Sequence, residues 1–190
     1  MNKKDLNSLN TYLTETLVGN QITAVNVLVL DDKEPMVNDD GWLLSDAGIE
    51  LTFSNDKKLT FCYDAEYEVN DIFSEKILDV CDFEKQQLFD ESDQDIWKPY
   101  MKQKIANFSV DWNWYMSLED EQFYMPLKID LQFENGEKLS LASIEFEEIN
   151  DDELTIFPDS EGAVMVVFNN ELADVLAEGV ANLEENDEEE

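Results

Sequence analysis

Apolar and polar residues alternate through Ile49–Phe53 and again through Leu59–Phe61, with Asn55-Asp56 between the two runs. This pattern predicts a β-hairpin, because successive side chains of a strand point to opposite faces. The stretch Ile129–Leu141 repeats it position by position, 80 residues further on, with Asn135-Gly136 at the turn. Asn-Gly is a strong hairpin signal. We interpret the two stretches as copies of one unit, although alternation alone makes any two hairpins look alike.

The similarity continues upstream of both hairpins. Gln21–Val27 resembles Lys104–Val110, and each follows a short helical pattern, over residues 6–17 and 96–101. We therefore predict an α+β fold with two tandem helix-strand-hairpin-strand units and mostly antiparallel sheet, in which the units could share one sheet. The predicted division is a first repeat at 1–80, an acidic connecting segment at 81–95, a second repeat with a C-terminal strand and helix at 96–183, and a disordered acidic tail at 184–190.

Two further segments complete the predicted elements. The apolar positions of Ile72–Phe83 are spaced as in a helix. The continuous apolar run Gly162–Phe168 predicts a central strand, followed by a short helix that begins at Asn169 or Asn170.

Charge changes the picture, because the chain holds 46 Asp and Glu against 12 Lys and a net charge of −34. This is far beyond the charge of about 2–8 that keeps a small domain soluble. Nucleic-acid backbones and anionic membranes would be repelled, so neither is an expected direct partner. A basic protein would be attracted. The segment between the hairpins, residues 64–95, carries 12 acidic residues and two lysines.

Catalysis has little support in the sequence. There is no His, the usual general acid or base, and no Gly-rich phosphate loop, so we predict neither an enzyme nor a cofactor. The acidic runs at 90–95 and 150–153 lack the Gly and closing Glu of an EF-hand, so no metal site is predicted. Cys62 and Cys81 are expected to be buried free thiols. The N-terminus shows no signal-peptide pattern and no apolar run is long enough to span a bilayer, which together predict a cytoplasmic protein.

The candidate partner-binding residues are acidic side chains of the connecting segment and two aromatic residues. They are Asp82, Glu84, Asp90, Glu91, Asp93, Asp95, Trp114 and Tyr115. In a strand, Val110, Trp112 and Trp114 would share one face, which favours a core position for both tryptophans. The alternative is that Trp114 and Tyr115 anchor an interface, where aromatic residues are enriched.

Three stretches carry a resemblance to a known class: Ile129–Leu141, Leu154–Ser160 and Val164–Asn169. In style, this small, acidic, His-free chain with Asn-Gly hairpins resembles the immunity proteins of bacterial polymorphic-toxin systems. The resemblance implies a basic toxin partner, commonly a nuclease, whose nucleic-acid groove is blocked by carboxylates. Two alternatives remain open: a DNA mimic that inhibits a DNA-binding or defence enzyme, and a structural or ligand-binding module with a pocket between its halves.

Overall fold

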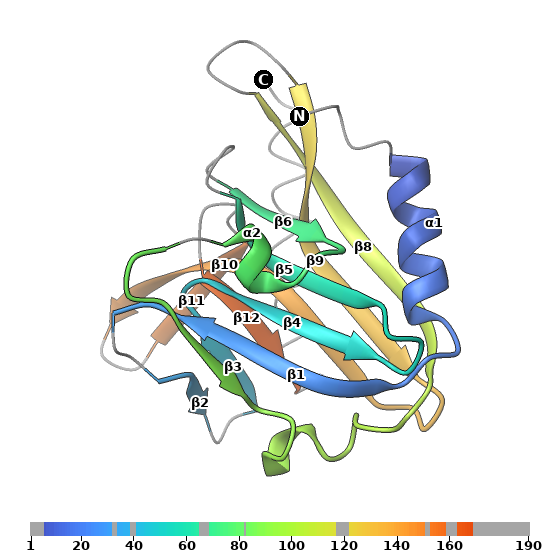
Figure 1. Ribbon diagram of the computed structural model, residues 1–190. Helices are drawn as coiled ribbons and strands as arrows, with labels where there is room; N and C mark the ends of the chain where they lie inside the picture. Colours follow the sequence, from blue (N-terminus) through green and yellow to red (C-terminus); the bar gives the residue numbers. More distant parts are fainter. Residues whose placement is uncertain are drawn as a thin grey trace.

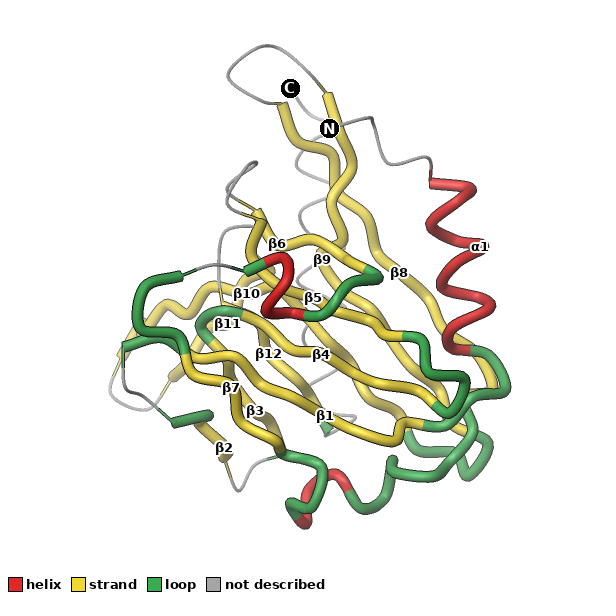
Figure 2. Tube along the Cα trace, in the orientation of Figure 1, coloured by secondary structure: helices red, strands yellow, loops and turns green. Residues whose placement is uncertain are grey.

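The computed structural model of the chain describes residues 6–31, 34–38, 41–64, 69–81, 83–116, 122–150, 153–158 and 163–168. These residues form two antiparallel sheets, one in front of the other, with a helix at one side (Figure 1). Strands dominate the trace, and the helical parts are short (Figure 2). The predicted class, α+β with mostly antiparallel sheet, is confirmed.

The front sheet has five strands within the described residues. In spatial order they are β6 (Val69–Phe73), β5 (Lys58–Asp64), β4 (Gly48–Phe53), β1 (Ile22–Val29) and β7 (Gln87–Asp90). Outside this sheet lie α1 (Leu6–Leu17), α2 (Ile77–Val80) and the 3₁₀ turn η1 (Asp95–Trp97). None of these helical segments is long and apolar enough to cross a membrane.

The back sheet has seven strands in the same part of the chain. In spatial order they are β2 (Met36–Asn38), β3 (Trp42–Ser45), β12 (Ala163–Val167), β10 (Lys138–Asn150), β9 (Gln122–Phe133) and β8 (Ile105–Met116), with β11 (Glu153–Pro158) paired to a further part of β10. The far ends of β8 and β9 rise above the rest of the sandwich as a two-stranded ribbon (Figure 1).

The main hydrophobic core lies between the two sheets. Alternating residues of β1, among them Val25 and Val27, are fully buried in one cluster with Leu139 and Leu141 of β10. This follows from the sequence, because alternation places every second side chain on the inner face. Leu17 of α1 joins the same core, so the helix is held by its apolar side while its polar side stays in solvent.

The two predicted hairpins both form, and their registers correspond at the spacing of 80 residues. Leu51 pairs with Leu59 in the first, and Leu131 pairs with Leu139 in the second. Each turn is closed by the same kind of hydrogen bond, from Phe53 N to Lys57 O at 3.0 Å in one case and from Phe133 N to Glu137 O at 2.9 Å in the other. The third turn residue has positive φ in both, 61° at Asp56 and 91° at Gly136. Glycine tolerates that conformation without the steric penalty that Asp56 carries.

The neighbouring strands correspond as well. Both β1–β4 and β8–β9 have a register shift near their start, between Ile22 and Ala24 in one pair and between Ile105 and Asn107 in the other. After the shift, β1 and β8 advance along β4 and β9 in step. On the other side of the hairpins, β6 pairs with β5 in the register in which β12 pairs with β10. Four strands of the front sheet therefore match four of the back sheet in order and register.

The two hairpins lie in different sheets, so the option of one shared sheet does not describe this molecule. Strand pairing also crosses the predicted boundaries. β3, from the first predicted repeat, pairs with β12 of the second, and the connecting segment supplies β7, which pairs with β1. The central position predicted for Gly162–Phe168 is confirmed, since β12 lies between β3 and β10. The predicted C-terminal helix and acidic tail lie outside the described residues.

Two helix predictions are wrong. Val69–Phe73 is a strand, because β5 offers it an open ladder and Ile72 pairs with Phe61; only Ile77–Val80 is helical in that segment. The helix expected over 96–101 shrinks to η1, since Pro99 has no N–H to continue the helical ladder. Cys62 and Cys81 are both buried and free, as predicted, and the adjacent thiol of Cys81 together with burial raises the pKa of Cys62.

Candidate functional site

The acidic turn, residues 90–95, is the part of the predicted site that the structure brings together. It leaves β7 at the edge of the front sheet and leads into η1. Its backbone is fixed to β1, because Glu91 N donates to Val25 O at 2.9 Å and Val25 N donates to the Ser92 hydroxyl at 2.9 Å. Just beyond the turn, Trp97 is fully buried. Its ring packs edge-to-face against the Phe168 ring, with the two ring centroids 4.8 Å apart. The acidic side chains therefore project from an ordered support.

Asp90 is satisfied within the turn. Its carboxylate accepts a hydrogen bond of 2.5 Å from the Ser92 hydroxyl and one of 3.0 Å from Ser92 N. Both bonds favour the ionised form and lower the pKa of Asp90. Asp90 is thus a stable negative charge whose lone pairs are partly used to shape the turn.

Glu91 is different, because it is 7% exposed and its carboxylate has no hydrogen-bond or ion-pair partner within the described residues. Burial, and secondarily the negative charge of Asp90, raise the pKa of Glu91 above its ordinary value of 4.5. The Glu91 oxygens are not among the side-chain atoms that are buried away from solvent without a partner, so the carboxylate keeps some contact with water while the rest of the side chain is covered. A partly desolvated carboxylate without a partner still costs some free energy. The turn therefore holds a negative group that an incoming cation would stabilise.

The other two acids of the turn are exposed. The Asp95 carboxylate forms an ion pair with Lys98, which lowers the pKa of Asp95. Asp93 does not contact Lys98, but its negative charge contributes to raising the pKa of the Lys98 amine. Exposed charges of this kind contribute little to stability but attract oppositely charged partners.

The remaining predicted residues do not join this group. Glu84 is exposed in the turn that precedes β7, and Asp82 lies outside the described residues. Trp114 and Tyr115 lie in β8, where their backbones pair with Tyr124 and Phe123 of the ribbon that rises beyond the sandwich. The structure thus places the two aromatic candidates in a different sheet from the acidic turn.

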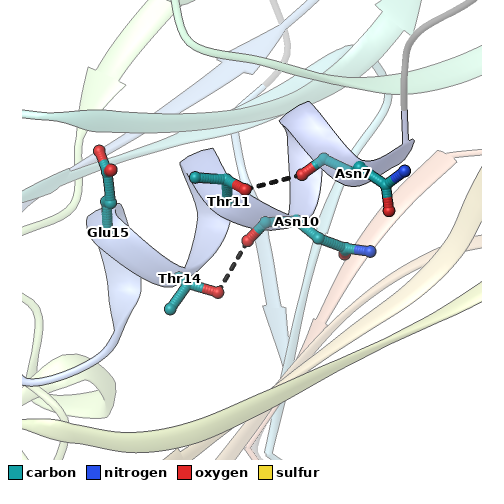
Figure 3. A pocket seen from close by; sticks show the side chains of 5 residues that line it. All are labelled: Asn7, Asn10, Thr11, Thr14 and Glu15. Carbon is teal, nitrogen blue, oxygen red and sulfur yellow. Dashed lines mark hydrogen bonds between the residues drawn. The ribbon is translucent and has the colours of Figure 1, made fainter.

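A shallow hollow lies on the exposed side of α1 (Figure 3). It is lined by Asn7, Asn10, Thr11, Thr14 and Glu15. The two threonine hydroxyls are engaged, donating to the helix carbonyls of Asn7 and Asn10 at 2.8 and 2.7 Å, and Glu15 forms an ion pair with Lys57 at 2.7 Å. The hollow offers little chemistry for a ligand and does not lie between the two hairpins, where a ligand-binding module would place its pocket.

Sequence reasoning selected Glu91 but treated it as equal to the other acids. What distinguishes Glu91 is its low exposure. That low exposure depends on the pairing of β7 with β1 and has no local signal in the sequence. The role of Ser92 was missed; an Asp-x-Ser sequence, in which the Asp side chain bonds the backbone two residues on, is a signal that could have found it.

The chain matches no protein-family model, no curated protein and no solved structure. Among the described residues, no group of three or more potential ligands (Asp, Glu, Cys or His) is arranged to hold a metal ion.

Proposed function

We propose that this protein is a non-catalytic cytoplasmic inhibitor that neutralises a basic partner, and that the partner is a nuclease-type toxin for which this chain is the immunity protein. The acidic turn is the proposed centre of the contact. The observation that carries the proposal is Glu91, a largely covered glutamate whose carboxylate has no partner within the described residues and which lies in an acidic turn whose backbone is fixed.

An Arg or Lys of the partner that reached Glu91 would supply the missing hydrogen bonds and charge. Because Glu91 is already partly desolvated in the free protein, part of the desolvation cost of the pair is met before binding. Asp93 and Asp90 would surround that contact with further negative charge, and the net charge of −34 would speed the encounter at low salt. Trp114 and Tyr115 remain proposed anchors on the β8–β9 ribbon, and Asp82 and Glu84 remain proposed outer contacts.

We also propose that the chain is built from two copies of one strand-hairpin-strand unit, of which only the first is preceded by a full helix. Support comes from the matching hairpin registers and from the matching shifts at Ile22 and Ile105. The connections that precede β1 and β8 also exchange matching bonds, from Gly19 N to Ile105 O and from Lys102 N to Ile22 O. Gly19 and Lys102 share a positive φ, of 76° and 62°. The copies would thus be related by a rotation that exchanges the two sheets.

The test uses the basic protein encoded beside this gene. The two chains are co-expressed, cell survival is scored, and the dissociation constant is measured by calorimetry at low and high salt. We expect survival, binding that weakens with salt, and an increase of about tenfold in the dissociation constant for Glu91→Gln.

The matched control is Asp79→Asn, which removes one exposed charge from α2, away from the acidic turn, and should leave binding nearly unchanged. Binding that is insensitive to salt, or equal losses for both variants, would contradict the proposal. Comparable binding to several unrelated DNA-binding proteins would instead favour the DNA-mimic alternative.

A further inference from the structure

Within the part of the chain that the structure describes, the outer edge of β8 is a long free edge of the back sheet. Beyond the bridges that hold Ile105 to Val18 and Gln21 to Lys104, β8 pairs only with β9 within the described residues. No described backbone hydrogen bond outside the strand ladders involves residues 106–112. Helix α1 runs alongside and contacts β8, but a helix cannot satisfy the N–H and C=O groups of a strand edge (Figure 1).

The front sheet shows what the corresponding edge can hold. β1 occupies the place in its sheet that β8 occupies in the other: Val25 pairs with Leu51, and Phe108 pairs with Leu131, after the same register shift. On β1 the opposite edge is filled by β7, with Val27 facing Phe89.

The outward-pointing groups of β8 follow from this correspondence. Val25 uses both its N–H and its C=O to bond the β7 side, so alternate residues of β1 point there. By the matching register, the residues of β8 whose N–H and C=O point to the free edge are Phe108 and Val110. The N–H and C=O of Ile105, before the shift, also point outward. The N–H donates to Asn20 O, and the C=O accepts from Gly19 N.

Helix α1 lies alongside this edge (Figure 1), but the strand itself lacks the blocking residues that proteins usually place on exposed strands. Lysines, prolines or inward charges normally block a free edge against pairing. β8 has none of these over its 12 residues, and Asp111 is its one charged residue. That charge is partly compensated, because the Lys128 amine on β9 lies 3.2 Å from Asp111 and 3.0 Å from Asp130 and is shared between them. In a chain in which 31% of residues are charged, this long strand thus has a single charged side chain.

We propose that the β8 edge accepts an extended segment of the basic partner protein as an added antiparallel strand, bonded to Phe108 and Val110 in the register that β7 has on β1. The identity of the partner rests on the proposed function; the availability of the edge does not. A second copy of this chain is the weaker candidate for the same edge, because two molecules of charge −34 repel each other.

Amide hydrogen exchange of the full chain, followed by NMR, tests the proposal. The probe is a synthetic peptide in which the sequence of Gln87–Phe89 is flanked by lysines. In the free protein the Val27 amide should exchange slowly, because β7 covers it, and the Phe108 and Val110 amides should exchange fast. Saturation with the peptide should slow Phe108 and Val110 by at least about tenfold, the factor that about 1.4 kcal/mol of added protection gives.

The variant Val110→Pro removes one outward N–H, a change that an edge strand tolerates, and should abolish peptide binding. Ser109→Ala, at a position whose N–H points to β9, is the matched control and should bind as the wild type does. If Val110→Pro does not fold, the exchange comparison in the wild type still decides the question.

Slow exchange of Phe108 and Val110 in the free monomer would overturn the proposal, because the chain itself would then cover the edge. Protection that appears only as the protein concentration rises would assign the edge to a second copy and overturn it too. Peptide binding that protects other residues, or none, would have the same effect. Each of these results leaves the salt-dependent toxin test unaffected, so failure of the edge and failure of the proposed function are distinguishable.

Discussion

Glu50 in β4 and Glu91 just after β7 are both glutamates of low exposure, 3% and 7%, yet their hydrogen-bond partners differ completely. Glu50 accepts hydrogen bonds from Lys58 Nζ at 2.5 Å, from Asn26 at 3.0 Å and from Ile77 N at 2.8 Å. Burial alone would raise the pKa of Glu50, but these donors lower it below 4.5. Glu91 has burial without donors, and its pKa is raised. One carboxylate is fully used by the fold, and the other remains available to a partner.

The largest effect on stability is expected at Glu50, the carboxylate whose hydrogen-bond partners are all in place. Replacing Lys58 by Met would leave Glu50 buried without its cation, and breaking a buried pair in this way costs about 3 kcal/mol. Urea unfolding of Lys58→Met against the wild type measures the loss in the free energy of unfolding. The neighbouring pair of Lys57 with Glu15 is largely exposed, so Lys57→Met should lose far less. Similar losses for both variants would contradict the structural role given to Glu50.

A change of the opposite sign in the free energy of unfolding is expected when Glu91 is replaced. Glu91→Gln removes a partly desolvated charge that has no partner, so at pH 7 the variant should be more stable than the wild type, by less than about 1 kcal/mol. The gain should shrink as the pH falls, because the wild type takes up a proton at Glu91 more readily when folded than when unfolded, and its penalty disappears by the time the pH is below 4.5. Thermal unfolding of both proteins from pH 7 to pH 4 gives the difference directly. A less stable variant at pH 7 would show that Glu91 is a structural residue.

The smallest effect is expected on the pKa of Glu91 when the neighbouring charge of Asp90 is removed. Asp90→Asn should lower the pKa of Glu91, because Asp90 contributes to raising it, while burial keeps it above the ordinary value. NMR titration of the Glu91 carboxyl carbon measures the change. Asp93→Asn is the control, since Asp93 does not contribute to the pKa of Glu91. An unchanged titration in Asp90→Asn would assign the raised pKa to burial alone.

The sequence predicts the elements whose information is local. The hairpins at 49–61 and 129–141 carry alternation and turn residues within 13 positions, and the run before Phe168 is apolar enough to require a central strand. β3 and β7 carry no such signal. Each is four residues long and exists because a distant strand offers it a ladder, β12 for one and β1 for the other. The same holds for the candidate site, because β7 also determines which of the four acids in the turn becomes buried.

The pairing of β3 with β12 has a consequence for the order in which the molecule is assembled. Residues 42–45 leave the ribosome long before residues 163–167, and β12 must enter between β3 and β10 to complete the back sheet. Contacts so far apart in the chain form slowly, since the entropy cost of closing a long loop comes before the contacts stabilise the fold. Until synthesis passes residue 167, β3 and β10 keep open edges and the core lacks Val164 and Val166. The last quarter of the chain therefore closes the fold, and any premature stop before β12 yields a protein that is unfinished in its first quarter as well.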